Sequence, residues 1–261
     1  MPQPTEDPAR RSGPTRIGAA GAPWLLRYQS VDRVRADPHP RTVSPGAFER
    51  QMGWLRARGL RGVSVRELLD ARDAGAPDAA RGLVGLTFDD GYADFATRAV
   101  PVLLRYGFTA TVFMVSGRMG RGSAWEGGPG KSLMTPDQLR TVTRAGMEVG
   151  SHGRSHAALP GVADAELATE LEVSRLTLED VIGGEVVGFA YPYGRVTSRE
   201  IAAARAAGYG YACAGGTCAP GGPIVPGGRF ALPRARVGER EGRLLLGAKL
   251  LHHEWRTRSR V

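Results

Sequence analysis

Cysteine is scarce in this sequence of 261 residues, which contains only Cys213 and Cys218. Two cysteines are too few for a scaffold that depends on disulfide bonds. A pair of cysteines with no other ligands close by in the sequence is also a poor zinc site. We therefore expect both to be free, partly buried thiols, while the sequence leaves open that they pair with each other.

Long apolar stretches are absent as well. No run approaches the roughly 20 apolar residues that a membrane-spanning helix needs, and the N-terminus has no apolar signal-peptide core. The sequence thus predicts no membrane span and a cytoplasmic location, with export left open if the start is mis-assigned. Residues 1–23 mix proline, glycine, arginine and acidic residues, a composition that predicts a disordered N-terminal tail.

Acidic residues are outnumbered, because 35 Lys and Arg face 26 Asp and Glu, giving a net charge of +9. Such a balance raises the question of a nucleic-acid partner. The basic residues are spread along the chain, however, and cluster only near residues 10–16 and 256–260. We therefore expect no nucleic-acid interface, and at most a general attraction to acidic polymers such as anionic glycans.

Apolar runs and helical patterns alternate along the rest of the chain. Strands are expected at residues 24–28, 62–64, 83–88, 109–115, 148–150, 186–190, 209–212 and 232–237. Helices are expected at residues 44–58, 65–74, 95–106, 136–145, 163–183 and 198–207. This alternation predicts an α/β fold with a parallel sheet, open or closed into a barrel. In such folds, functional residues lie at the carboxyl ends of the strands.

The first polar cluster follows the expected strand at 83–88 and reads Thr87-Phe88-Asp89-Asp90-Gly91. Two adjacent carboxylates repel each other, and a bound cation relieves that repulsion. One carboxylate could then bind a metal while the other acts as a base. Asp-Asp-Gly is equally typical of an ordinary turn, so this cluster alone leaves both interpretations open.

The second cluster, Ser151-His152-Gly153-Arg154-Ser155-His156, follows the strand at 148–150. The whole chain has five histidines, and two of them stand four residues apart here. Histidines at this spacing can bind one ion, and together with a carboxylate they leave room for water and substrate. The two clusters at neighbouring strand ends thus favour a catalytic metal site.

With a third motif, Tyr191-Pro192-Tyr193-Gly194 after the strand at 186–190, the chain resembles the polysaccharide deacetylase family with the NodB-type homology domain (carbohydrate esterase family 4). TFDDG, SHGRSH and the Pro-Tyr-Gly turn occur in the family's order. The resemblance implies a deformed (β/α) barrel of about seven strands. It covers a catalytic domain at residues 24–238, followed by a basic C-terminal helix or tail at 239–261.

The same resemblance implies roles for individual residues. Asp90, His152 and His156 would hold a divalent metal, with zinc first and cobalt, nickel or manganese as alternatives. Asp89 would be the general base that takes a proton from the attacking water. The backbone N–H of Tyr193 would stabilise the oxyanion.

The chain departs from the family pattern at several positions. Ala190 stands where relatives often have an arginine that orients the base. His252, in Leu250-Leu251-His252, is the predicted catalytic acid, and Arg234 or Arg236 is a further candidate for acting on the substrate. Gln29 replaces a histidine that many relatives carry on the first strand. Trp125, in a glycine-rich loop, could stack on a sugar ring or simply pack in the loop.

Three functions follow as hypotheses. The first is metal-dependent hydrolysis of an N-acetyl group on a glycan or amino sugar. The second is deacetylation or amide hydrolysis of a non-polymeric small molecule, which the absence of an export signal and Gln29 favour. The third is a non-catalytic glycan-binding relic. The expected partner is an N-acetylated sugar or glycan, and the sequence does not indicate an oligomeric state.

Overall fold

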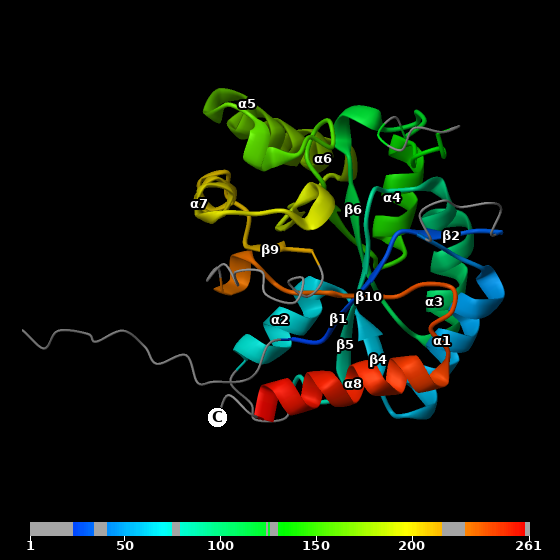
Figure 1. Cartoon of the computed structure of the whole chain (residues 1–261). Helices are drawn as coiled ribbons and strands as arrows, with labels where there is room; N and C mark the ends of the chain where they lie inside the picture. Colours follow the sequence, from blue (N-terminus) through cyan, green and yellow to red (C-terminus); the bar gives the residue numbers. More distant parts are fainter. Residues whose placement is uncertain are drawn as a thin grey trace, which may run out of the picture.

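The computed structural model describes residues 23–33, 41–74, 79–123, 125, 130–215 and 228–258, without the side chains of residues 243 and 252–258. A curled parallel sheet forms its centre (Figure 1), with strand order β10-β1-β5-β6-β7-β8-β9 and β4 paired to β5. The strands are β1 (Leu25–Tyr28), β4 (Arg61–Val63), β5 (Leu83–Phe88), β6 (Thr111–Met114), β7 (Glu148–Ser151), β8 (Gly188–Ala190), β9 (Tyr211–Cys213) and β10 (Ala235–Arg236). The predicted α/β class and deformed barrel are thereby confirmed.

Residues 232–236 connect the two edges of this sheet. Leu232 forms a parallel bridge with Cys213 at the end of β9, and three residues later Ala235 pairs with Leu26 of β1. A strand was predicted over 232–237, but only β10 is regular. The segment changes partners between two strands, so it cannot form one continuous ladder with either.

The helices begin where their capping residues predict. The side chain of Ser44 accepts a hydrogen bond at the start of α1 (Pro45–Ala57), and Thr135 forms a capping box with Gln138 at the start of α4 (Pro136–Arg144). α7 (Ser198–Ala206) begins with a second capping box. Figure 1 shows α1, α4 and α7 outside the strands, together with α3 (Val100–Tyr106) and α6 (Ser174–Ile182).

The short helix α2 (Val65–Asp73) packs against the apolar interior of the curled sheet. Val65 and Leu68 belong to a buried cluster that includes Leu25 and Phe113. The hydroxyl of Thr111 on β6 accepts a hydrogen bond from the backbone N–H of Val65 at 2.8 Å. The interior is therefore a packed core, and the functional residues lie at the strand ends.

Two predicted helices contain a turn of π-helix. Residues 95–106 divide into η1 (Phe95–Ala99) and α3 (Val100–Tyr106). Residues 163–183 divide into α5 (Asp164–Ala168), η4 (Thr169–Val173) and α6 (Ser174–Ile182). Such turns are frequent at functional sites.

A small sheet of β2 (Ser30–Val31) and β3 (Thr42–Val43) was not predicted.

The last described helix, α8 (Arg243–Arg258), lies against α1, where Gly247 adjoins the indole of Trp54. It occupies the predicted basic C-terminal segment. The predicted N-terminal tail lies outside the described residues, and the predicted domain boundaries stay predictions. Among the described helices, none has both the length and the apolar character to cross a lipid bilayer.

Candidate metal centre and catalytic site

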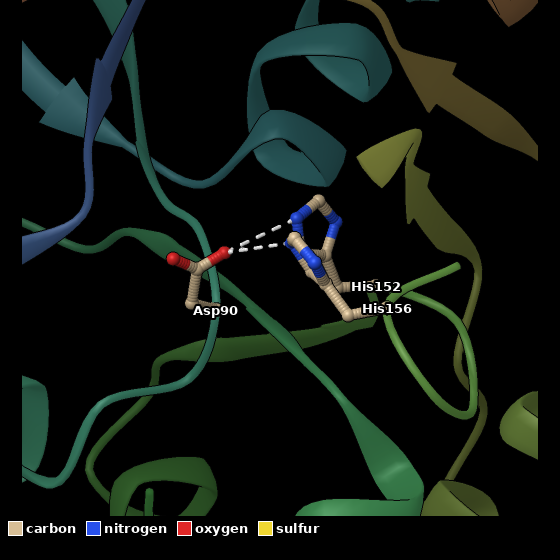
Figure 2. Close-up of side chains that lie close together, drawn as sticks. All are labelled: Asp90, His152 and His156. Atoms are coloured by element: carbon tan, nitrogen blue, oxygen red, sulfur yellow. Dashed lines mark ion pairs between the residues drawn. The ribbon is translucent and has the colours of Figure 1, made fainter. Parts of the chain in front are cut away.

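Asp90, His152 and His156 converge at the carboxyl ends of β5 and β7 (Figure 2). One oxygen of Asp90, Oδ1, lies 3.3 Å from Nε2 of His152 and 3.3 Å from Nε2 of His156. All three side chains are buried. Their ligand atoms lie within 4.8 Å of one another, close enough to share one ion. The structure thus brings together the three residues predicted to bind a metal.

The spacing of these atoms fits a divalent metal. Ligand atoms bound tetrahedrally at roughly 2.0–2.1 Å from zinc lie about 3.3–3.4 Å apart, which matches both Asp90–histidine distances. Nδ1 of His152 lies 2.7 Å from the carbonyl oxygen of Ala190. Because a carbonyl oxygen only accepts, Nδ1 carries a hydrogen, and Nε2, the nitrogen nearer Asp90, is the atom that would bind a metal.

The protonation states of the cluster are consistent with a metal-binding role. Burial would raise the pKa of Asp90, but its hydrogen bonds with His152 and His156 hold that pKa well below its usual value. Burial lowers the pKa of His156, against the opposing effect of Asp90. The amide of Gln29 donates a 3.0 Å hydrogen bond to Oδ2 of Asp90. Gln29, noted above only as a departure from the family, therefore helps to orient this carboxylate.

Backbone strain concentrates at this site. Three non-glycine residues of the described chain have a positive φ, namely Asp90 at 73°, His156 at 66° and Tyr193 at 59°. This conformation is costly for residues with a Cβ and persists where surrounding structure enforces it. All three belong to the predicted site, so the strain supports a functional reason for their placement.

A buried carboxylate holds the loop that carries the two histidines. Oε2 of Glu170, in η4, accepts hydrogen bonds from the backbone N–H groups of Arg154 at 2.8 Å and Ser155 at 2.9 Å. Glu170 is buried, which is unusual for an acidic residue. No sequence motif singles out Glu170. Its only signal was an acidic residue next to the apolar stripe of the helix.

Asp89, next to Asp90 in the chain, is held by Arg234. Nη1 and Nη2 of Arg234 donate to the two carboxylate oxygens at 2.5 and 3.0 Å, and Nε donates to the carbonyl of Ala214 at 3.1 Å. Both side chains are buried. Burial would raise the pKa of Asp89, but the charges of Arg234, His152 and Arg27 outweigh it and lower the pKa.

The bidentate contact with Arg234 orients Asp89, the predicted base. Arg234 was predicted as a candidate for acting on the substrate, whereas its guanidinium is occupied by Asp89, Ala214 and Thr87. Ala190 stands where relatives often have an arginine that orients the base. Arg234, in the segment 232–236 that connects the two sheet edges, supplies that positive charge here. Arg236, the other candidate, is exposed.

Two aromatic side chains flank His156. The indole of Trp125 stacks on the imidazole, with ring centroids 4.3 Å apart and an interplanar angle of 18°. The ring of Tyr193 meets it edge-on at 4.7 Å and is half exposed. Nε1 of Trp125 is buried with no hydrogen-bond partner in the described structure. Both residues border the metal centre, where a substrate would have to enter.

His252, the predicted acid, falls in α8, and its side chain lies outside the described residues. Its role stays a prediction.

Cys213 is a buried free thiol, and burial raises its pKa to about 12. Cys218 also lies outside the described residues.

Comparison with known proteins adds an independent line of evidence. Residues 76–212 match the family described as "Polysaccharide deacetylase". The Bacillus subtilis protein YxkH, whose name assigns it to the polysaccharide deacetylases, is 30% identical over 215 residues, covering 82% of this chain and 70% of that protein. An Escherichia coli poly-beta-1,6-N-acetyl-D-glucosamine N-deacetylase is 33% identical over 97 residues, only 35% of this chain and 14% of that protein.

A solved structure supports the fold. The Streptococcus pyogenes deacetylase PplD, in complex with acetate, matches with a TM-score of 0.74 at 23% sequence identity, over 88% of this chain and 98% of that chain. At this identity the likeness concerns the arrangement of strands and helices.

Proposed function

Because the chain belongs to the polysaccharide deacetylase family, we propose that it hydrolyses an N-acetyl group on a glycan or amino sugar and releases acetate. The match to this family confirms the family that the three short motifs predicted. The observation that carries the proposal is the buried Asp90–His152–His156 cluster next to an anchored Asp89. The name of the Escherichia coli relative, which specifies an N-acetyl-D-glucosamine polymer, supports this class of substrate.

We assign the metal site to Asp90, His152 and His156. A divalent metal bound there would polarise the acetyl carbonyl and lower the pKa of a water molecule. Two imidazoles and one carboxylate suit zinc, while cobalt, nickel and manganese also accept this donor set. Gln29 and the Ala190 carbonyl hold two of the three ligands in place.

Asp89 acts in this proposal as the general base. Its lowered pKa keeps it ionised at neutral pH, so it can accept the proton of a water molecule that attacks the acetyl carbon. A new C–O bond forms and the C–N bond breaks, which leaves acetate and a free amine. Arg234 is a positioning residue, because it fixes both oxygens of Asp89.

Tyr193 and His252 complete the proposed mechanism. The backbone N–H of Tyr193, set by the left-handed turn, would donate to the carbonyl oxygen as negative charge develops there. His252 would protonate the leaving amine. Trp125, beside His156, offers an aromatic face on which a sugar ring could stack.

A substrate panel tests the proposed class. Zinc-loaded protein is incubated with N-acetylglucosamine oligomers of increasing length and with N-acetylated metabolites that are not sugars, and acetate is measured. We expect turnover on the sugars. Turnover confined to the non-sugar compounds would replace the proposal with the small-molecule alternative. Binding of the oligomers without acetate release would support a non-catalytic role.

A further inference from the structure

The C-terminal helix α8 carries an apolar stripe that faces away from the protein. Leu244 is 90% exposed, Leu245 52% and Leu251 66%. Of the seven large apolar side chains exposed in the described part of the chain, these three lie on one helix. Leu244, Ala248 and Leu251 are spaced i, i+4 and i+7, which places them on a single helix face. Ala248 is exposed as well.

The opposite face of α8 is already occupied. Leu246 is fully buried in the main core, and Leu250 is packed against that core. Gly247 lies beside Trp54 of α1. Figure 1 shows α8 running along the outside of the molecule. Packing against the body of the protein therefore explains Leu246 and Leu250, but it does not explain the outward leucines.

The charge of this segment is strongly asymmetric. Residues 243–258 contain four basic residues, Arg243, Lys249, Arg256 and Arg258, and one acidic residue, Glu254. Of the two acidic residues just before the helix, Glu239 is engaged by Ser44 and Glu241 neutralises Lys249 of the helix itself, so the excess positive charge rests on the arginines. Glu239 accepts from the hydroxyl of Ser44 at 2.8 Å, and Glu241 pairs with Lys249 at 2.6 Å. They do not offset the arginines of the helix.

We propose that α8 docks in the plane of an anionic lipid surface. Exposed leucines together with excess arginine are the combination by which interfacial helices bind such membranes. The helix is too short and too polar to span a bilayer. An anionic glycan would match the arginines but leave the leucines in water. A second copy of the chain would bring net charges of +9 together. The lipid surface satisfies both features.

Vesicle co-sedimentation tests this proposal. The full chain is mixed with vesicles of equal parts phosphatidylglycerol and phosphatidylcholine, and separately with pure phosphatidylcholine vesicles. We expect binding to the anionic vesicles that weakens in high salt, and little binding to the neutral ones. The double variant Leu244→Gln/Leu251→Gln should bind at least about tenfold more weakly.

Leu176→Gln is the matched control, because Leu176 is 56% exposed on α6, away from α8. It should bind like the unmodified chain. Circular dichroism should show native helix content for every variant, since the changed side chains are exposed. The zinc-induced rise in melting temperature should be unchanged in the double variant, because neither leucine belongs to the metal centre, which separates this proposal from the proposed function.

Two outcomes would overturn the membrane assignment. Equal vesicle binding by the double variant and the unmodified chain would show that the stripe is not the contact. A concentration-dependent dimer in sedimentation velocity, lost in the double variant and accompanied by no vesicle binding, would show that a second copy covers the stripe.

Discussion

At the scale of single residues, the pairing of Arg234 with Asp89 determines how the proposed base works. Replacement of Arg234 by Met leaves buried Asp89 with only the more distant Arg27, 4.0 Å away, so its pKa rises. We expect kcat/KM to fall about 100-fold, because the base is no longer held in position. The acidic limb of the pH profile should move to higher pH, since Asp89 is now protonated over a wider range.

The double variant Asp89→Asn/Arg234→Met is the control for stability. Breaking a buried ion pair on one side costs about 3–5 kcal/mol of unfolding free energy, whereas removing both charges costs much less. Urea denaturation should therefore show Arg234→Met to be less stable than the double variant. An unchanged pH profile in Arg234→Met would contradict the positioning role.

The sequence identified the metal-binding candidates more readily than the residues that support them. Asp90, His152 and His156 stand in short motifs directly after apolar strands, so these motifs and the family resemblance that they carry were sufficient. Arg234 lies 145 residues from Asp89, and its contact depends on a segment that joins two sheet edges. Glu170 reaches the histidine loop from a distant helix. Contacts of this kind are set by the assembled sheet and leave no local signal.

At the scale of elements, the turn after β5 is closely packed. Gly91 has a φ of 75°, and a Cβ at this position would lie 2.2 Å from the sulfur of Met114. We expect Gly91→Ala to lower the unfolding free energy by about 1–2 kcal/mol through the left-handed backbone and by about 1–3 kcal/mol more through the clash. It should also weaken metal binding, because Asp90 is the preceding residue.

Gly146→Ala is the matched comparison for this turn. Gly146 has a φ of 84°, but a Cβ there meets nothing within 4 Å. It should show only the backbone cost and keep normal metal affinity. Equal destabilisation of the two variants in chemical denaturation would argue against the contact with Met114.

Helix and strand positions followed largely from the sequence, since capping residues and apolar runs are local signals. The π-helical turns η1 and η4 were not predicted, because a one-residue bulge leaves nearly the same apolar spacing as an α-helix. β2 and β3 were missed because each has only two residues.

At the scale of the whole molecule, the three metal-binding candidates come together only when β5 and β7 are in place. A metal that binds the folded state alone stabilises it, by about 2.7 kcal/mol when the free metal is 100 times its Kd. We expect zinc to raise the melting temperature, and a chelator to reverse the effect. His156→Ala should lose most of this shift. If zinc raised the melting temperature of His156→Ala by a similar amount, the metal would have to bind elsewhere.

The most direct test of the account is acetate release from N-acetylglucosamine oligomers by metal-loaded protein and its Asp89→Asn variant. The account predicts acetate from the unmodified chain, loss of activity with a chelator, and recovery when metal is restored. Asp89→Asn should bind metal normally yet lose at least about 100-fold in kcat. Acetate release by Asp89→Asn at the unmodified rate, or none from any amino sugar with metal fully bound, would contradict it.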